Sequence, residues 1–321
     1  MLLAANRQIC PAQSLARRVV RTFIPALALL LVLAALFGAS TAPGSAASAD
    51  NAAPVAYVVH PKPTARNTGV PAGIKLRPVY HNIKVTRAGT VLNRLDIHGF
   101  VEVLAPNVTI KNSIVRGGVA HGNAGLIQNV SDRAKHLVIS HTELVPAHPS
   151  VWLDGIKGWN YTLQYSDIHG TVDGAKVYGN NVVIRYSYIH NLASYSHDPN
   201  QGGEPTHNDA VQVLGGHHVR IVRNTLLGGG NAALQITQSH GDTNGLTFQS
   251  NWVGGGACSL NVAVKPLRAM RGVIITGNRF WRTSIYKCAM IIDKTVTAKL
   301  SNNRYLDNRA LVNVVPRAPK G

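Results

Sequence analysis

The stretch "NVVIRYSYI", residues 181–189, alternates branched apolar residues with polar ones until the alternation breaks near Ser187. In a β-strand alternate side chains face the same side, so Val182 and Ile184 are predicted to point inward and Arg185 outward. A short polar side chain such as Ser187 can satisfy backbone groups at a tight bend. The stretch therefore predicts a short strand, a bend and a second short strand.

The pattern of this stretch recurs along most of the chain. Eight segments share the order apolar, x, apolar, x, x, Asn/Ser/Thr, x, apolar, and they begin at residues 107, 136, 160, 181, 218, 245, 272 and 297. The spacing between them varies from 21 to 37 residues. Stacked turns would align the shared polar residues into a ladder that bonds to neighbouring backbone. The predicted ladder residues are Ser113, Thr142, Ser166, Ser187, Asn224, Asn251, Asn278 and Asn303.

A second short alternating run accompanies most of these segments, for example "DAVQVLG" at 209 and "AALQIT" at 232. Glycine-rich corners such as Gly228-Gly229-Gly230 separate the runs. Two or three short strands per turn of about 25 residues, without helical periodicity, predict an all-β fold, a single-stranded right-handed parallel β-helix of about 8–9 turns. Leucine-rich repeats share the same core pattern. They predict leucine dominance and constant repeat length, whereas this chain uses Val and Ile freely.

Residues 1–49 are predicted to be a signal peptide. Four arginines precede the apolar run 23–37, and Ala47-Ser48-Ala49 has the small-x-small form of a signal peptidase site. The alternative is an uncleaved anchor, but this apolar run is shorter than the roughly 20 residues that span a bilayer. We expect cleavage before Asp50 and a secreted protein, extracellular or associated with the cell wall.

The rest of the chain is predicted to form one domain with irregular ends. Residues 50–75 are rich in Ala, Pro and Gly and are interpreted as a linker or an irregular N-terminal cap. The β-helix is predicted over 76–308, and residues 309–321 are predicted to be a C-terminal tail. We expect a monomer without a stable membrane span after signal cleavage.

The charge of the chain favours anionic partners. Removing the leader, which holds four arginines and no acidic residue, lowers the formal net charge from +18 to +14. The field of such a surface attracts polyanions such as uronic-acid polysaccharides or teichoic acids. Solubility alone is the alternative explanation. Nucleic acid is disfavoured, because the basic residues are scattered and not interleaved with aromatic residues in one patch.

Two cysteines remain after the leader and its Cys10 are removed. Cys258 and Cys288 each lie two residues before an apolar strand position in successive turns. Strands in adjacent turns lie about 4.8 Å apart, within the Cα separation that a disulfide tolerates. An exported protein favours a disulfide over a metal site, so we predict that these two residues are bonded.

Several segments resemble the secreted pectin-lyase-like β-helix proteins of actinobacteria. These are "NTGVPAGIKLRP" (67–78), "AGTVLNRLDI" (88–97), "NVTIKNSIVRGG" (107–118), "YKCAMI" (286–291) and "SNNRYLDN" (301–308). The resemblance covers most of residues 67–308 and implies the β-helix fold. The wider superfamily contains lyases, hydrolases, epimerases and inactive members, so the resemblance alone implies no particular reaction.

The longest spacing, 37 residues, contains the polar stretch "SHDPNQGGEPTHNDAVQV" (196–213). Insertions in a solenoid leave it as loops, and loops on a rigid scaffold often carry function. The alternation predicts an outward column just before this insertion, formed by Glu143, Asp167 and Tyr188 with His169 and His190 beside it. The following strands predict a second outward stripe of Lys176, Gln212, Gln235 and Asn261.

A lyase acting on a uronan must neutralise the sugar carboxylate, remove the C5 proton and assist departure of the C4 oxygen. Imidazole titrates near neutrality, a lysine can act as a base if its neighbours lower its pKa, and a tyrosine can act as the acid. The candidate catalytic residues are His190, His207, Asp209, Lys176, His169 and Tyr188. The candidate substrate-binding residues are Arg116, Asp167, Arg185, Gln212, Gln235 and Asn261.

Two other chemistries use the acidic residues near the insertion. A hydrolase needs two carboxylates, which Asp173 with Asp209 or Asp167 with Glu143 would supply. Calcium prefers hard oxygen ligands, which Asp173, Asp209 and Glu204, together with Asp154, would offer.

Purely structural roles explain the same residues in other ways. In this alternative the histidines of the "IH" pairs only end strands, Asp173 and Asp209 cap turns, and the Lys/Gln/Asn stripe is a solvated face. We therefore carry two hypotheses. One is a secreted lyase that cleaves an anionic polysaccharide by β-elimination, with a hydrolase as its variant. The other is a noncatalytic protein that binds a glycan or the cell wall through the same groove.

Overall fold

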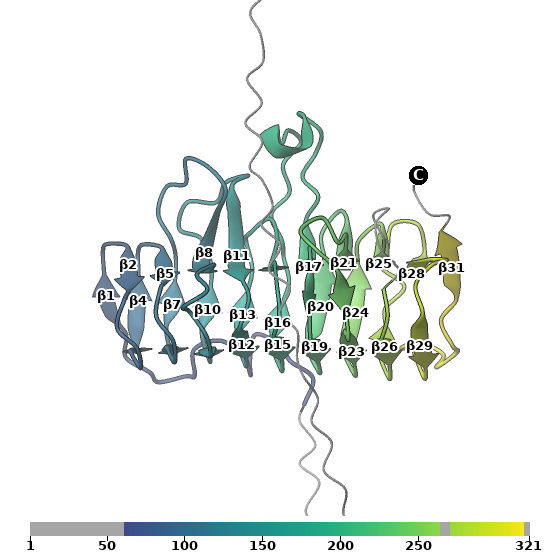
Figure 1. Cartoon of the computed structure of the whole chain (residues 1–321), viewed down its shortest axis with the longest axis horizontal. Helices are drawn as coiled ribbons and strands as arrows, with labels where there is room; N and C mark the ends of the chain where they lie inside the picture. The colour runs from purple at the N-terminus through teal and green to yellow at the C-terminus, as the bar shows by residue number, and fades with distance from the viewer. Residues whose placement is uncertain (1–60, 264–269, 318–321) are drawn as a thin grey trace, which may run out of the picture. The chain divides into compact units, whose positions relative to one another are not determined.

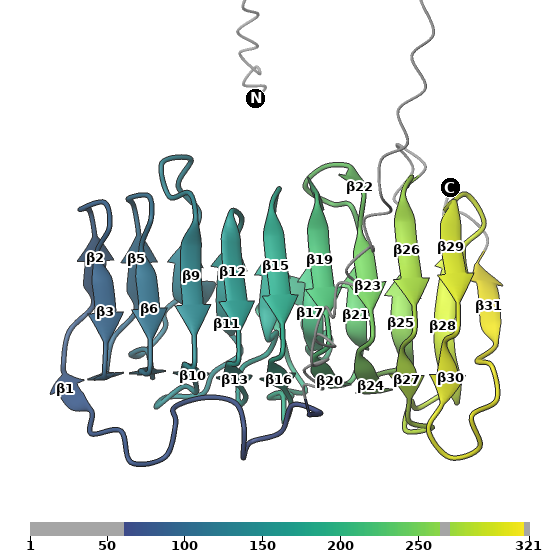
Figure 2. The same cartoon turned by 90° about the horizontal axis from the view of Figure 1, so that it is seen from below.

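The computed structural model describes residues 61–263 and 270–317, which wind through successive coils of short strands. Equivalent strands of neighbouring coils stack into three long sheets, here called A, B and C, and the chain visits them in that order (Figure 1; Figure 2). Sheets A and B have ten strands each and sheet C has nine. The pairings within these sheets are parallel, so the predicted right-handed parallel β-helix is confirmed.

The strands are two to six residues long, and their bounds are as follows. Sheet A contains β1 (Arg77–Val79), β4 (Leu95–Ile97), β7 (Ile114–Val115), β10 (Glu143–Leu144), β13 (Asp167–Ile168), β16 (Tyr188–Ile189), β20 (Thr225–Gly228), β24 (Trp252–Gly255), β27 (Arg279–Phe280) and β30 (Arg304–Tyr305). Sheet B contains β2 (Ile83–Val85), β5 (Val101–Val103), β8 (Ala124–Asn129), β11 (Leu153–Gly158), β14 (Ala175–Val177), β17 (Asp209–Val213), β21 (Ala232–Ile236), β25 (Cys258–Val262), β28 (Cys288–Asp293) and β31 (Val314–Arg317). Sheet C contains β3 (Val91–Asn93), β6 (Thr109–Lys111), β9 (Leu137–Ser140), β12 (Tyr161–Gln164), β15 (Val182–Arg185), β19 (Val219–Val222), β23 (Thr247–Gln249), β26 (Val273–Thr276) and β29 (Ala298–Ser301). The short strands β18 (Gly216–His217) and β22 (Thr243–Asn244) form a separate pair.

The core is the interior of the coil, and branched apolar side chains from all three sheets fill it. Val182 and Ile184 of β15 are fully buried, whereas Arg185 is exposed, as the alternation predicted. Ile189 of sheet A and Val211 of sheet B are fully buried in the same core. Burying such a side chain stabilises the fold by about 1.5–3 kcal/mol, so repetition over many coils gives a rigid support for outward side chains.

The predicted polar ladder lies at the bend from sheet C to sheet A. The backbone N–H of Asn224 donates to Oδ1 of Asn251 at 2.9 Å, and that of Asn251 donates to Oδ1 of Asn278 at 2.9 Å. All three side chains are fully buried. In most coils the residue just before the ladder position has a left-handed backbone, as at Arg223 (φ 57°) and Ser250 (φ 55°). The ladder thus satisfies the buried backbone groups at this sharp bend.

The 191–208 insertion leaves the coil between sheets A and B, as predicted, and rises above its neighbours in Figure 1. The 3-10 helix η1 (Pro199–Gln201) lies within it, and the Asp198 side chain accepts a hydrogen bond from the backbone of Asn200 at 2.8 Å. The stem is closed by backbone and side-chain bonds between Tyr195 and Thr206, both 3.0 Å. These bonds give the insertion a defined course at the edge of sheet B.

The ends of the β-helix differ in part from the prediction. The helix begins at β1, close to the predicted start. Residues 61–76, here called the N-terminal segment, run along the outer side of sheet A (Figure 2). At the other end, β31 adds a strand to sheet B within the region predicted as a tail. The predicted signal peptide lies outside the described residues.

The predicted disulfide is confirmed. Cys258 at the start of β25 and Cys288 at the start of β28 are register partners on adjacent strands. They are bonded, with a Cα separation of 4.7 Å. The bond joins the last coils of the β-helix across a loop of about 30 residues.

Candidate functional site

A groove lies on the outer face of sheet B beside the 191–208 insertion. The strand register aligns Gln212 of β17, Gln235 of β21 and Asn261 of β25. These three side chains line a cavity of about 440 Å³, here called the sheet-B groove. The other lining residues are Gln201, His207, Leu214, Asn231, Thr237, Ser239, Ala263 and Arg317. The predicted stripe of amides is therefore present, and its role in binding stays a prediction.

Most polar groups of the sheet-B groove are neutral. Amide and hydroxyl side chains both donate and accept hydrogen bonds, which suits the hydroxyl groups of a sugar. His207 is exposed, and imidazole is the side chain that most often exchanges a proton near neutral pH. Arg317 adds a permanent positive charge at the end contributed by β31. The groove therefore combines hydroxyl-binding groups with one proton acceptor and one cation.

Three aspartates lie at the same position of successive coils at the start of the sheet-B strands. They are Asp154, Asp173 and Asp209, and all three are buried. The backbone N–H of Asp209 donates to Oδ1 of Asp173 at 2.7 Å, and that of Asp173 donates to Oδ1 of Asp154 at 3.2 Å. Asp154 and Asp173 therefore each bind the backbone of the following coil, which is a structural role like the turn-capping alternative given for Asp173 and Asp209.

Two lysines neutralise this aspartate ladder. Lys176 Nζ lies 2.8 Å from Asp173 Oδ2 and 3.2 Å from Asp154 Oδ2. Lys157 Nζ lies 3.2 Å from the same oxygen of Asp154. Burial alone would lower the pKa of Lys176, but the charges of Asp173 and Asp154 outweigh it and raise that pKa. The condition under which Lys176 would act as a base, neighbours that lower its pKa, is therefore not met.

Asp209 is fully buried, and among the described residues no lysine forms a salt bridge with it. Burial, followed by the charge of Asp173, raises the pKa of Asp209 well above its usual range, although a hydrogen bond from Asn231 (2.9 Å) favours the ionised form. Burial likewise raises the pKa of Asp173 to about 6, against the lowering effect of Lys176. Asn231 also lines the sheet-B groove, so it separates the buried Asp209 from any ligand there.

The predicted calcium site does not fit this arrangement. The Lys176 ammonium already contacts two of the expected ligands, and Asp209 is engaged with Asn231. Glu204 lies on the exposed insertion, where its backbone bonds to Gln201 and Asp198. Among the described residues, no group of three or more His, Cys, Asp or Glu side chains is placed to hold a metal ion.

The predicted histidine column lies on sheet A. The register pairs Glu143 with Asp167 and Asp167 with Tyr188, as the alternation predicted. His169 Nε2 lies 3.0 Å from Glu143 Oε1, and His190 Nε2 lies 2.9 Å from Asp167 Oδ1. The hydrogen bond to Glu143 is the main cause that raises the pKa of His169, and it lowers the pKa of Glu143. These imidazoles are engaged in carboxylate pairs and lie away from the groove.

Aromatic stacking and the N-terminal segment cover this column. The Tyr188 and His190 rings stack with centroids 3.8 Å apart, and His190 is only 8% exposed. Burial is the main cause that raises the pKa of Tyr188. The N-terminal segment crosses the column, because the backbone N–H of Gly69 donates to the carbonyl of Tyr165 at 2.9 Å. A Cβ at Gly69 would lie 3.2 Å from that of Asp167, so glycine permits this close approach.

The predicted residues therefore do not converge in one place. His207 lines the sheet-B groove, whereas His169, His190 and Tyr188 lie on sheet A.

No protein-family model, curated protein or solved structure matches this chain. The assignment of a function thus depends on the geometry. Among residues 61–263 and 270–317, no helix has the length and apolar character that crossing a membrane requires.

Two predicted substrate-binding arginines lie outside the groove. Arg116 pairs with Asp96 on sheet A, with Nε 2.6 Å from Oδ1. Arg185 projects from sheet C and donates to Gln164 Oε1 at 2.9 and 2.6 Å. Sheet C is a different face of the coil from the sheet-B groove. Neither arginine is placed to bind a ligand of that groove.

Sequence reasoning missed several lining residues of the groove. Gln201 was inside the polar stretch that was singled out, but nothing in its neighbourhood distinguished it from Asn200. Asn231 directly precedes β21 and aligns with Asn208 one coil earlier. It lies four residues before Gln235, so continuing the outward alternation back along this coil would have found it. Arg317 lies in β31, which carries no repeat signal.

Proposed function

We propose that this chain is an exported polysaccharide-active protein that binds an extended glycan along the outer face of sheet B. We also propose that it is related to the pectin-lyase-like β-helix proteins that it resembles. The single observation that supports the binding role is the register-aligned row Gln212–Gln235–Asn261, flanked by His207 and Arg317.

The shape of the groove favours a polymer over a small metabolite. Side chains at one position of neighbouring strands repeat every 4.7–4.9 Å or so along the coil axis. Such a row presents the same amide chemistry to successive units of a chain. The charge of +18 for the whole chain, reduced to +14 without the leader, favours a glycan that carries acidic units.

Cleavage by β-elimination is the second part of the proposal, and His207 is its base. Neutral His207 takes the C5 proton of a uronic acid unit. The electron pair of that C–H bond forms the C4–C5 double bond, the C4–O bond breaks, and the leaving oxygen takes a proton from water. The Gln212 amide, on the strand that follows His207, donates to the carboxylate of the reacting unit. Arg317, four strands further along sheet B, binds the carboxylate of another unit of the same polymer. This assignment rests on His207 being the one histidine among the described residues that line the groove.

The hydrolase variant receives less support from the geometry. Asp173 and Asp209 are buried and hydrogen-bonded within the aspartate ladder, and Asn231 lies between Asp209 and the groove. Asp167 and Glu143 are paired with histidines on sheet A. A glycosidase needs its acid and its base or nucleophile on either side of the scissile bond, and neither pair lines the sheet-B groove.

The binding test uses a matched pair of variants. Gln235→Ala removes an amide from the groove, whereas Gln128→Ala removes the same amide from an equivalent sheet-B position four coils earlier, outside the groove. The mature protein is titrated with alginate, pectate, hyaluronan and chondroitin. We expect binding to at least one polymer and a loss of about tenfold for Gln235→Ala alone. Equal affinities of the two variants would contradict the proposed groove.

The cleavage test follows the absorbance of the unsaturated product with the polymer that binds best. We expect product with the parent protein and at least a hundredfold less with His207→Ala, whose affinity should change little. Binding without any product would remove the lyase part and leave the noncatalytic glycan-binding role. Cleavage that survives in His207→Ala would remove His207 as the base.

A further inference from the structure

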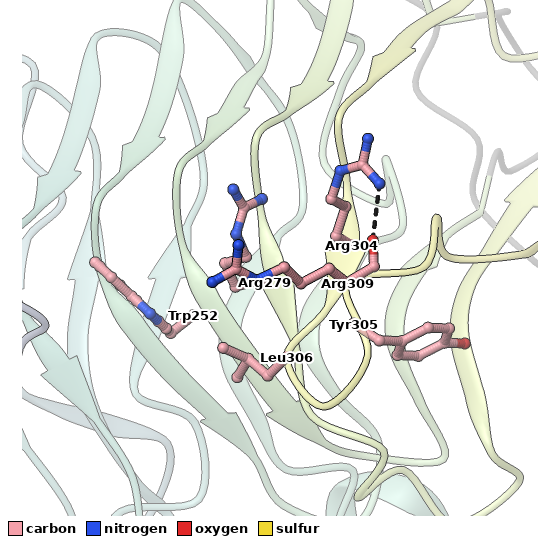
Figure 3. Close-up of a pocket in the computed structure, with 6 residues that line it drawn as sticks. All are labelled: Trp252, Arg279, Arg304, Tyr305, Leu306 and Arg309. Atoms are coloured by element: carbon pink, nitrogen blue, oxygen red, sulfur yellow. Dashed lines mark hydrogen bonds between the residues drawn. The ribbon is translucent and has the colours of Figure 1, made fainter.

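A second open site lies at the C-terminal end of sheet A, on a different face from the sheet-B groove. The outward column of sheet A continues beyond the histidines, and the register aligns Trp252 of β24 with Arg279 of β27 and Arg304 of β30. Together with Tyr305, Leu306 and Arg309 they line a cavity of about 610 Å³ (Figure 3). This volume is within the range of small-molecule sites. We call it the arginine pocket.

The guanidinium groups of the pocket are held in place by uncharged partners. Arg279 Nη1 donates to the carbonyl of Asn302 at 3.2 Å. Arg304 Nε donates to Asn302 Oδ1 at 2.9 Å, and its Nη1 donates to the carbonyl of Arg309 at 2.7 Å (Figure 3). Each guanidinium has five N–H donors in a fixed plane, so these bonds orient the groups without using all their donors.

No acidic side chain neutralises these charges in the part of the chain that the structure describes: Arg279, Arg304 and Arg309 form no salt bridge there. The nearest acidic residue in the sequence, Asp307, is paired with Arg282 at 2.8 Å. This contrasts with the N-terminal half of the same column, where Glu143 and Asp167 each have a histidine partner. Three cations in one cavity repel one another unless an anion binds between them.

The indole of Trp252 adds an apolar surface to this cationic site. Trp252 is partly exposed, and it directly precedes Arg279 in the column. An indole face packs against the C–H face of a sugar ring, while guanidinium forks bind carboxylates in a bidentate manner. A uronic acid unit has both features, an apolar ring face and a carboxylate on the ring. A simple inorganic anion would use the arginines but not the indole.

We propose that the arginine pocket binds a uronic acid unit of an anionic polysaccharide, with the carboxylate on Arg279 and Arg304 and the ring against Trp252. The pocket does not depend on the sheet-B groove, and the proposal stands whether or not that groove binds a glycan. If both sites bind, two faces of one rigid coil hold the polymer. Attachment at a second site then becomes intramolecular and strengthens retention without new contacts.

The experiment titrates a galacturonic acid trisaccharide into the mature protein and follows tryptophan fluorescence and heat. The test variant is Arg279→Gln/Arg304→Gln. The control, Arg87→Gln/Arg133→Gln, removes the same charge from exposed positions outside the pocket. We expect the test variant to bind at least tenfold more weakly than the control. Equal affinity of the two double variants would overturn the proposal.

Further variants and ligands separate the contributions of the pocket residues to binding and control for misfolding. Arg309→Gln changes an exposed side chain and should weaken binding by about threefold while leaving the fold intact. Trp252→Phe should abolish most of the fluorescence change. Inorganic phosphate should bind at least tenfold more weakly than the trisaccharide. Binding of phosphate, or of the carboxyl-reduced neutral trisaccharide, as tight as that of the uronide would overturn the assignment to a uronic acid unit.

A further variant distinguishes the failure of the arginine-pocket proposal from the failure of the sheet-B groove proposal. Gln212→Ala/Gln235→Ala should remove groove binding and leave the trisaccharide affinity of the arginine pocket within about twofold. Loss of all uronide binding in this variant, together with no loss in Arg279→Gln/Arg304→Gln, would place the ligand in the groove alone. That result would overturn the second site and leave the proposed function standing.

Discussion

Replacing Lys176 by methionine should destabilise the fold strongly and in a pH-dependent way. The substitution keeps an unbranched apolar chain but leaves the Asp173 carboxylate, 1% exposed, without the ammonium that lies 2.8 Å away. Removing one partner of a buried ion pair costs about 3–5 kcal/mol. Lys176 itself is 21% exposed, and Asp154 keeps Lys157 as a partner. We therefore expect about 3 kcal/mol, the lower end of that range.

The cost should shrink as the pH falls. The pKa of Asp173 is already raised to about 6 in the folded protein, above the value of about 3.9 for an unfolded chain. The folded state therefore takes up this proton first, and stability gained from Asp173 appears as the pH falls through the folded value. Without Lys176 the folded pKa rises further, so at about pH 5 Asp173 is neutral and needs no cation.

Urea unfolding of Lys176→Met and of the parent protein at about pH 8 and about pH 5 measures both effects. The double variant Asp173→Asn/Lys176→Met should recover more than half of the loss at the higher pH, because no uncompensated charge remains. A loss below about 1 kcal/mol at both pH values would refute the structural role of this pair. Unchanged stability of Lys176→Met combined with loss of polymer cleavage would also refute this structural role. That result would make Lys176 a catalytic base.

Three further outcomes test the scaffold and the histidine column. Asn251→Ala should cost about 2–4 kcal/mol in urea unfolding, because it leaves the Asn224 N–H and the Ile221 carbonyl of the preceding coil without their partner; a loss under about 0.5 kcal/mol would contradict the ladder. Cys288→Ser should lower stability by about 3–4 kcal/mol through the loop that the disulfide closes, and thermal melting that matches the parent would argue against a bond in solution. His169 should titrate above its ordinary value by NMR, because its bond to Glu143 favours the protonated ring. The stability it contributes is present at low pH and is lost as the pH rises through the folded pKa; Glu143→Gln should lower that pKa, and no change would show that the pair does not form.

The sequence predicted well which side chains of each coil point inward and where each coil bends, because both depend on residues close together in the sequence. Alternation with a period of two decides which side chains enter the core, and Val182 and Ile184 are buried as it predicted. The bend needs a short polar side chain, and Asn251 is hydrogen-bonded there as expected. The same alternation placed Gln212 and Gln235 side by side on the outer face.

The number of coils was slightly underestimated for a physical reason. In the first complete turn Leu95 occupies the ladder position, and its backbone N–H donates to Ser113 Oγ at 3.1 Å. An apolar residue at that position hides the repeat, although the strand pairs normally. The last strand, β31, follows the last of the eight repeat segments, which begins at residue 297, so no ladder residue of the sequence pattern signals it.

The candidate site was harder to predict, because the decisive contacts join residues far apart in the chain. Alternation shows that His190 faces outward, but it does not show that Asp167 of the previous coil binds it. It also gives no sign that Gly69 passes over the same column. The arginine pocket could have been predicted from the sequence, because Trp252, Arg279 and Arg304 occupy positions equivalent to Tyr188 in later coils.

The path of the N-terminal segment constrains the order in which the molecule is assembled. Lys62 lies over the Trp281 ring, with Nζ 5.1 Å from its centroid, yet Trp281 directly follows β27 near the far end of the chain. During synthesis the segment emerges before the coils, whereas Trp281 emerges near the end of the chain. The contact of Lys62 with Trp281 can therefore form only after most coils have wound, whereas the contact of Gly69 with Tyr165 can form earlier.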